Sequence, residues 1–347
     1  MMIRYNLLVN RNYTIGVVIN TLPAIKILEE MKIKEAWTIE LKNGAYGGLK
    51  PIIDPFDKNR FYLSDGWGSA FPSIKLRQLS FSDGKELNSV SIKNIVRCLY
   101  FSSDGRNMFA VSDNKIFQID RINLSIIKKF DKGIQRYSDY ISSNNKDSLL
   151  LMNYNSDYLC VYNYLTEKGI KKKLKSCKGI IQGETPDTFL IFCPKTGTVL
   201  KYYLMENKLE EIIRTDIYYS AWKGNSGTFY FHLGKIVEAT SNTHEHIVPT
   251  NKIITISANQ PNLTNEIILD AEYRKFWISE NEELMYLNNV NFMKRNQISI
   301  YLLKEKRIID TLNINKGEQI IELFDDKGVA LSYNIENPKK ITCWKYE

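Results

Sequence analysis

The feature that most constrains the fold is a unit of four short apolar segments that recurs along the chain. The clearest copy consists of Val96 to Ser102, Asn107 to Asp113, Lys115 to Arg121 and Ser125 to Asp131. Asp-Gly separates its first two segments, and this pair between alternating apolar runs predicts a β-hairpin. Similar units begin near residues 50, 96, 136, 179, 218, 266 and 318, so successive starts lie 39 to 52 residues apart.

The two ends of the chain complement each other. The last unit has only three segments, Gln319 to Phe324, Gly328 to Asn334 and Lys340 to Tyr346, whereas Glu35 to Leu41 is an extra segment before the first unit. Four strands in about 40 to 45 residues is the size of a propeller blade. An N-terminal strand added to the last unit would cover its exposed edge. The sequence therefore predicts an all-β fold: a seven-bladed β-propeller of four-stranded blades, closed by an N-terminal strand that joins the C-terminal blade.

Two intervals are longer than the others and are predicted to contain loop insertions, from His244 to Asn265 and from Glu282 to Asn296. Lys252 to Ala258 is predicted to be the outer strand of the fifth blade. Residues 1–34 are predicted to form an N-terminal extension with a hairpin and a short helix. Residues 35–347 then form a single propeller domain.

One segment resembles a known repeat. Tyr100 to Asn114 (YFSSDGRNMFAVSDN) is similar to the repeat of YVTN-type and lactonase-like β-propellers, in which a Ser-Pro-Asp-Gly-like turn joins two apolar strands. Ser103-Asp104-Gly105 matches that turn except that Pro is missing. The resemblance implies a fold shared by sugar lactonases, lyases, subunits of cofactor enzymes and interaction platforms, so it does not select a function. WD40 repeats fit less well, because no Gly-His and Trp-Asp pair recurs.

Charge gives a mild preference for acidic partners. The chain has 47 Lys and Arg against 39 Asp and Glu, a formal net charge of +8. The basic residues are scattered, and the densest cluster is Lys171, Lys172, Lys173, Lys175 and Lys178. A nucleic-acid site concentrates its positive charge on one face. Nucleic acid is therefore not the predicted partner, and the cluster is interpreted as a solvated strand and its turn.

Cysteine usage favours a reducing compartment. The five cysteines are odd in number, and no two show the C-x-x-C spacing of a zinc or redox site. The N-terminus lacks the basic start and clean apolar core of a signal peptide. No apolar run is long enough for a transmembrane helix. We therefore expect a cytoplasmic protein without a transmembrane segment.

Histidine limits the chemistry, because the chain has only His232, His244 and His246. His244 and His246 would face the same side of a strand, and His232 could supply a third metal ligand. The competing interpretation is a polar loop. The sequence contains no P-loop, no dinucleotide fingerprint and no G-x-S-x-G motif, so no cofactor is predicted.

The leading hypothesis is a non-catalytic scaffold that binds a protein or peptide on one propeller face. The chain has 21 Tyr, and Tyr suits such contacts because it combines a large apolar area with a polar tip. The candidate contact residues are Trp67, Phe71, Tyr154, Tyr158 and Phe292. Two alternatives remain open: a lactonase-like or metal-assisted enzyme with its site at the central channel, and a supporting subunit of a multi-chain enzyme. Whether the chain is an enzyme is left open, although the missing catalytic motifs favour a binding role.

Overall fold

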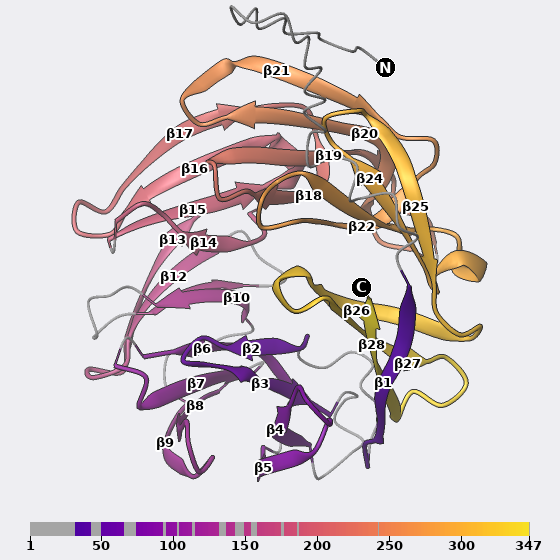
Figure 1. Ribbon diagram of the computed structural model, residues 1–347. Coiled ribbons are helices and arrows are strands. Elements are labelled where there is room, and N and C mark those ends of the chain that lie inside the picture. The colour runs from indigo at the N-terminus through magenta and orange to yellow at the C-terminus, as the bar shows by residue number, and fades with distance from the viewer. Residues whose placement is uncertain are drawn as a thin grey trace, which may run out of the picture.

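The computed structural model describes residues 32–42, 50–65, 74–92, 95–102, 104–112, 115–131, 137–142, 149–153, 158–174, 177–185, 187–241 and 243–346. Within these ranges almost all regular structure is β-strand, and the helical residues belong to short 3-10 turns. The molecule is an all-β propeller of small antiparallel four-stranded sheets. The sheets follow one another around a common centre, with the first strand of each nearest to it (Figure 1).

Six sheets consist of four consecutive strands, and we number them as blades 1 to 6. Blade 1 comprises β2 (Ile52–Asp54), β3 (Asp57–Ser64), β4 (Lys75–Ser80) and β5 (Glu86–Ser91). Blade 2 comprises β6 (Val96–Phe101), β7 (Asn107–Ser112), β8 (Ile116–Asp120) and β9 (Ile126–Phe130). Blade 3 comprises β10 (Tyr137–Ser142), β11 (Leu149–Asn153), β12 (Tyr158–Asn163) and β13 (Lys168–Lys173).

The other three follow the same order. Blade 4 comprises β14 (Ile180–Gln182), β15 (Thr188–Cys193), β16 (Thr198–Tyr203) and β17 (Lys208–Arg214), with the 3-10 turn η2 (Pro194–Thr196) after β15. Blade 5 comprises β18 (Tyr218–Lys223), β19 (Thr228–Val237), β20 (His246–Ser257) and β21 (Gln260–Ile268). Blade 6 comprises β22 (Tyr273–Ile278), β23 (Leu284–Asn289), β24 (Gln297–Leu302) and β25 (Arg307–Asn313), with η3 (Phe292–Lys294) after β23.

A further sheet combines the two ends of the described chain. Its strands are β26 (Glu318–Phe324), β27 (Val329–Asn334), β28 (Lys340–Tyr346) and β1 (Ile33–Glu40), and η4 (Asp325–Lys327) joins the first two. In this composite sheet β1 pairs antiparallel with β28, from Ile33 opposite Tyr346 to Glu40 opposite Lys340. The pairing that the sequence predicted is thus present, with β1 beginning two residues earlier. Six blades rather than seven are built from consecutive strands, so a count of seven depends on this composite sheet.

The core lies between the sheets, because each pair of neighbouring sheets shares one buried hydrophobic cluster. Tyr62 of blade 1 packs with Met108 of blade 2, and Tyr230 of blade 5 packs with Tyr273 of blade 6. The composite sheet packs on both sides in the same way. It shares a cluster with blade 6 through Trp344 and another with blade 1 through Trp37.

The fifth blade differs from its prediction. Lys252 to Ala258 is not the outer strand, because β20 is the third strand of the blade and β21 pairs on its outer side. No loop insertion spans the region after His244, because long β19 and β20 form an extended hairpin there. The second predicted insertion, Glu282 to Asn296, instead contains β23 and η3. Strand lengthening explains the first interval. The second only appeared long, because the sixth blade begins at Tyr273 rather than near residue 266.

The antiparallel order gives the propeller two faces. Turns that join first to second strands and third to fourth strands emerge on what we call face A. Connections from second to third strands, and those between blades, emerge on face B. Contacts between blades support this division. On face A the Arg121 guanidinium lies 5.2 Å from the Phe56 ring, and on face B Lys195 forms an ion pair with Glu245.

Candidate functional site

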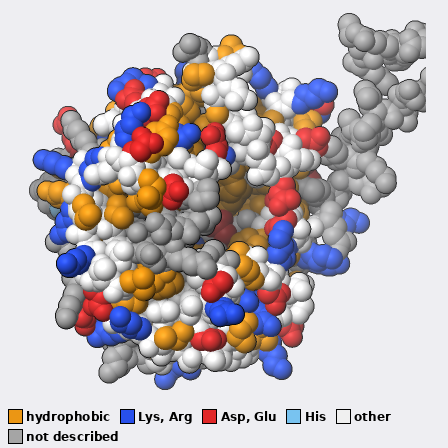
Figure 2. Space-filling view, turned by 90° about the vertical axis from the view of Figure 1, so that its left-hand side faces the viewer, with side chains coloured by type: hydrophobic (Ala, Val, Ile, Leu, Met, Phe, Trp, Pro, Cys, Tyr) orange, Lys and Arg blue, Asp and Glu red, His pale blue; other side chains and the backbone are white. Residues whose placement is uncertain are grey.

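A cavity of about 440 Å³ lies between the first strands of blades 2, 4 and 5. Most of its wall is apolar or aromatic. Its lining residues are Cys98, Leu99, Lys178, Gly179, Ile180, Ile181, Phe192, Pro194, Tyr218, Tyr219, Ser220 and Ala221. Lys178, Pro194 and Tyr218 belong to face B, because they lie between blades, in η2 and at the start of β18. Figure 2 shows the molecule from the opposite side, where the turns between third and fourth strands lie, and this face also has a hollow near its centre with hydrophobic side chains visible within it.

Local sequence explains how blade 4 shapes this wall. The residue before β14 that lines the cavity, Gly179, has a φ of +94° that side-chain-bearing residues rarely adopt. After β15, Pro194 begins η2, and Gly197 ends it in the left-handed conformation at φ 66°. These two breaks keep β14 short and fold η2 against the cavity. Phe192 and Pro194 thereby present apolar surface beside Ile180.

Blade 5 contributes hydroxyl-bearing residues to the wall. The Tyr218 hydroxyl donates a hydrogen bond to the Thr198 carbonyl oxygen at 3.1 Å, and burial raises the pKa of this phenol. Tyr218 is therefore neutral and already engaged. The Ser220 Oγ is buried and has no hydrogen-bond partner among the described residues. A buried hydroxyl without a partner costs stability, and this one is too enclosed to be reached from the cavity.

Two exposed ion pairs connect the extended hairpin of blade 5 to its neighbours. At its tip Glu245 forms an ion pair with Lys195 of η2, which directly follows the lining residue Pro194. At its base the Lys235 amine lies 3.9 Å from the Glu272 carboxylate in the connection to blade 6. Such exposed pairs add little stability.

The structure does not bring the three predicted metal ligands together. His232 lies in the core of blade 5, where its Nε2–H donates to the Thr250 carbonyl oxygen at 2.6 Å. His246 pairs with Val237, five residues further along the hairpin than His232, and its Nδ1–H donates to the His244 carbonyl oxygen at 2.9 Å. Within the residues that the structure describes, no group of three His, Cys, Asp or Glu side chains could hold a metal ion.

His232 is instead a buried neutral imidazole. Its Nδ1 has no partner among the described residues, and its ring lies edge-on to Tyr219 and Phe276 at centroid distances of 6.0 and 6.1 Å. Burial lowers the pKa of His232, while the hydrogen bond to Thr250 opposes that shift. Tyr219 also lines the cavity, so His232 supports the wall from behind.

The predicted contact residues are only partly described. Tyr158 begins β12 and Phe292 begins η3, so both lie on face B with substantially exposed side chains. Trp67, Phe71 and Tyr154 lie outside the described residues. The predicted N-terminal hairpin and helix, within residues 1–31, lie outside them as well. Neither Tyr158 nor Phe292 lines the cavity. Sequence reasoning missed the wall residues Tyr218 and Ser220, although the repeat had already identified their segment as a first strand.

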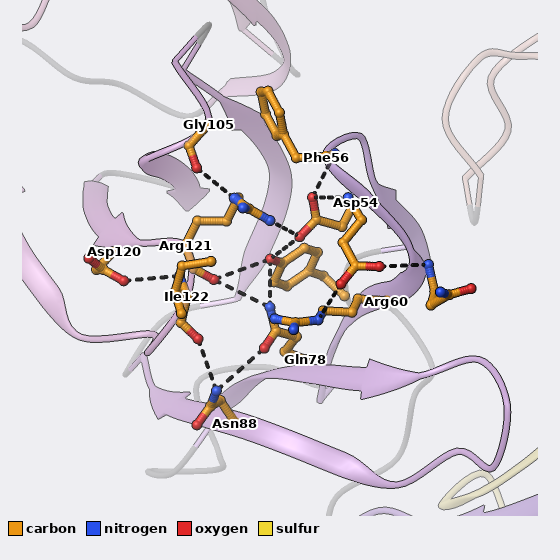
Figure 3. A network of polar contacts seen from close by, with 12 residues as sticks. Asp54, Phe56, Arg60, Gln78, Asn88, Gly105, Asp120, Arg121 and Ile122 are labelled. Carbon is orange, nitrogen blue, oxygen red and sulfur yellow. Dashed lines mark hydrogen bonds and ion pairs between the residues drawn. The ribbon is translucent and has the colours of Figure 1, made fainter.

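A second polar site lies between blades 1 and 2 (Figure 3). The Arg121 Nη1 donates to Asp54 Oδ2 at 2.6 Å, and the Tyr62 hydroxyl donates to the same oxygen at 2.9 Å. The Arg121 Nε donates to the Gly105 carbonyl oxygen at 2.6 Å, and Gln78 Nε2 donates to the Tyr62 hydroxyl at 2.9 Å. Because these buried groups satisfy one another, the network joins two blades and leaves little capacity for a ligand.

Among the described residues, Lys275 is the lysine whose pKa departs most from its ordinary value. It lies on the first strand of blade 6, and its Nζ donates to the Ile321 carbonyl oxygen of the composite sheet at 2.5 Å. Burial lowers the pKa of Lys275 to about 8, and the Glu322 carboxylate partly opposes this shift. The amine also lies 5.7 Å from the Trp277 ring centroid. These contacts hold β22 against β26, which is a structural role.

Comparison with known proteins does not assign the chain to a family. No protein-family model matches the chain, and no curated protein matches it. The similarity to YVTN-type and lactonase-like propellers therefore extends no further than the propeller fold. In the described ranges, no helix has the length and hydrophobicity that crossing a bilayer requires.

Proposed function

We propose that the composite sheet is the seventh blade of a closed ring, in which β1 supplies the outer strand. Two observations support this proposal. β1 pairs with β28 along seven residue pairs, and the composite sheet shares a hydrophobic cluster with the blade on each side. In a closed ring every sheet would pack against a neighbour on both sides. Such packing would hold face B and its cavity rigid.

We propose further that the protein is a non-catalytic scaffold that binds a peptide or a protein loop on face B. An apolar side chain of the partner would enter the cavity, and its backbone would lie across the rim beside the blade 5 hairpin. The observation that carries this proposal is the cavity on face B, whose wall includes the apolar and aromatic residues Leu99, Ile180, Phe192 and Pro194. Pockets that receive an apolar or aromatic side chain of the partner are the usual anchor points of protein interfaces.

The rim supports the same proposal. Phe292 and Tyr158 are exposed aromatic residues on face B, outside the cavity, where they could contact flanking residues of a peptide. Lys178 at the cavity edge adds positive charge, so a partner with acidic flanks is favoured.

The test is selection from a displayed library of random heptapeptides with the full chain as bait, followed by fluorescence polarisation with the enriched peptides. Ser220→Phe places a ring in the cavity and should weaken binding by about tenfold or more, because the anchor side chain is then excluded. Ser91→Phe is the matched control, since Ser91 is exposed at the end of β5.

Two results would count against the proposal. The first is a selection that enriches no peptide above background. The second is equal binding by the wild type and Ser220→Phe, provided that both melt at the same temperature. Hydrolysis of a lactone panel by the wild type, lost in Ser220→Phe, would favour an enzyme at the same cavity instead.

A further inference from the structure

Two of the five cysteines lie side by side in blade 4. Cys177 lies three residues before β14, and Cys193 is the last residue of β15. Both side chains are buried in the hydrophobic cluster between blades 3 and 4, where the Cys177 thiol forms a hydrogen bond with the Cys193 sulfur. We call these two residues the cysteine pair.

The backbone around the cysteine pair explains this contact. The Lys178 N–H donates to the Phe192 carbonyl oxygen at 2.6 Å, and the Phe192 N–H donates to the Gly179 carbonyl oxygen at 3.0 Å. Lys178 and Gly179 therefore both oppose Phe192, which is the arrangement of a β-bulge. The next residue on each strand is a cysteine, so Cys177 faces Cys193.

This geometry suits a disulfide bond. Residues directly opposite each other in antiparallel strands have Cα atoms about 4.5–5.5 Å apart. A disulfide spans a Cα separation of about 4.4–6.8 Å. Both side chains lie on the same side of blade 4, because they belong to one cluster. Formation of the bond therefore needs no large movement of either strand.

The cysteine pair also favours the thiolate, which is the reactive form of cysteine. The hydrogen bond from Cys177 lowers the pKa of the Cys193 thiol, and a hydrogen bond with Thr198 lowers it further, while burial opposes both. Cys343 shows the effect of burial alone, which raises the pKa of that thiol to about 12. Among the described residues, Cys343 is the only cysteine of its cluster. The hydrogen bonds from Cys177 and Thr198 therefore account for the difference.

We propose that Cys177 and Cys193 form a disulfide bond when the protein meets hydrogen peroxide. The Cys193 thiolate attacks one peroxide oxygen, so a sulfur–oxygen bond forms, the oxygen–oxygen bond breaks, and the departing hydroxide takes up a proton to become water. The Cys177 thiol then attacks the sulfur of this sulfenic acid, which forms the disulfide and releases a second water. Two thiols are oxidised to one disulfide, and one peroxide is reduced to two waters.

Burial of the cysteine pair selects the oxidant. Cys177 is 6% exposed and Cys193 is 1% exposed. A bulky disulfide cannot approach these sulfur atoms in the folded chain, whereas hydrogen peroxide is little larger than water. The proposed reagent is therefore a small peroxide rather than a thiol–disulfide exchange partner.

The disulfide would join two segments of the cavity wall. Lys178 directly follows Cys177, Phe192 and Pro194 flank Cys193, and these three neighbours line the cavity. Oxidation would thus fix the spacing of the two segments behind the wall. Disulfide formation is measured directly, so it is independent of whether a peptide binds in the cavity.

The test is treatment of the folded full chain with hydrogen peroxide, followed by blocking of the remaining thiols with iodoacetamide in denaturant and digestion without a reductant. Mass spectrometry should detect linked peptides that join Cys177 to Cys193. Over the same time Cys343 should still carry the blocking group, because its buried thiol is not ionised. We expect the cysteine pair to be oxidised at least about tenfold faster than Cys343.

Cys177→Ala should slow the oxidation of Cys193, because the thiolate loses its hydrogen-bond donor. The matched control is Cys343→Ala, which also shortens a buried cysteine and should form the linked peptides at the wild-type rate. Circular dichroism before treatment shows whether each variant is folded, and the wild-type measurement stands without either of them.

Three results would overturn the proposal. The first is a folded wild type whose cysteine pair is oxidised no faster than Cys343. The second is linked peptides that join Cys177 or Cys193 to a different cysteine. The third is oxidation of Cys193 that is equally fast in the wild type and in folded Cys177→Ala.

Discussion

Arg121 and Asp54 form a buried ion pair between blades 1 and 2, with 2.6 Å between Arg121 Nη1 and Asp54 Oδ2. Asp54 is fully buried, and its other oxygen accepts the backbone N–H of Phe56 at 2.9 Å. One carboxylate thus organises the turn of its own blade and binds the neighbouring blade. The pair links the stability of two sheets that are otherwise joined by apolar packing.

Removal of one partner of this pair should be strongly destabilising. We expect Asp54→Ala to lower the free energy of unfolding by about 3–5 kcal/mol, because the Arg121 guanidinium is left buried without its counter-charge. In a double-mutant cycle, Arg121→Ala and Asp54→Ala should show a coupling of about 0.5–3 kcal/mol. Urea denaturation measures both quantities. Glu211→Ala, which removes an exposed pair with Arg214, should leave the midpoint unchanged and serves as the control.

Gly84 should not tolerate a side chain. Its φ is +69°, and a Cβ there would lie 2.6 Å from Trp37 Cε3 of β1. Gly84→Ala should therefore cost more than the about 1–2 kcal/mol of the left-handed conformation alone. Gly227→Ala is the matched control, because its φ is +84° and the nearest atom to its Cβ is 3.9 Å away. Thermal unfolding measures the stability lost by each variant. Equal losses would mean that the Trp37 side chain moves aside without an energetic cost.

Loss of β1 should expose the edge of β28. The Trp37 Nε1–H donates to the Phe81 carbonyl oxygen at 2.8 Å, so β1 also joins the composite sheet to blade 1. A chain shortened through Leu41 should aggregate or melt at a much lower temperature, because an unpaired strand edge and an apolar cluster become exposed. A chain shortened only through residue 31 retains β1 and is the control. An unchanged melting transition in the shorter chain would refute closure by β1.

His232 should make the protein less stable in mild acid. Because burial lowers its folded-state pKa, the unfolded chain binds a proton first as the pH falls through the ordinary value of about 6.5. The free energy of unfolding therefore decreases below that pH, and this loss ends once the pH is below the folded-state pKa. His232→Gln should show a flatter dependence between about pH 7 and pH 5 in thermal melts. His244→Gln with His246→Gln, both exposed, should retain the wild-type slope, and a wild-type slope in His232→Gln would contradict the assignment.

The sequence alone was sufficient for the strands and for most of their grouping. The Asp104-Gly105 turn joins β6 and β7 as predicted, with Gly105 at φ +67°. Strand alternation and turn residues are local signals, and they survive in a single sequence. The prediction for the fifth blade was wrong because its hairpin lengthens without a change in residue pattern. Nothing in the residues around His244 distinguishes a long strand from a loop, and only the pairing of Val237 with His246 decides it.

Sequence by itself determined an all-β repeat of four-stranded units with an extra N-terminal strand for the last of them. Only the tertiary structure decided which residues of different sheets meet around the common centre. Cys98, Phe192 and Ser220 line one cavity although they come from three blades, and His232 is separated from His246 although both lie in one hairpin. The physical reason is that local patterns fix each strand's faces, whereas the arrangement of sheets around a common centre fixes which faces oppose each other.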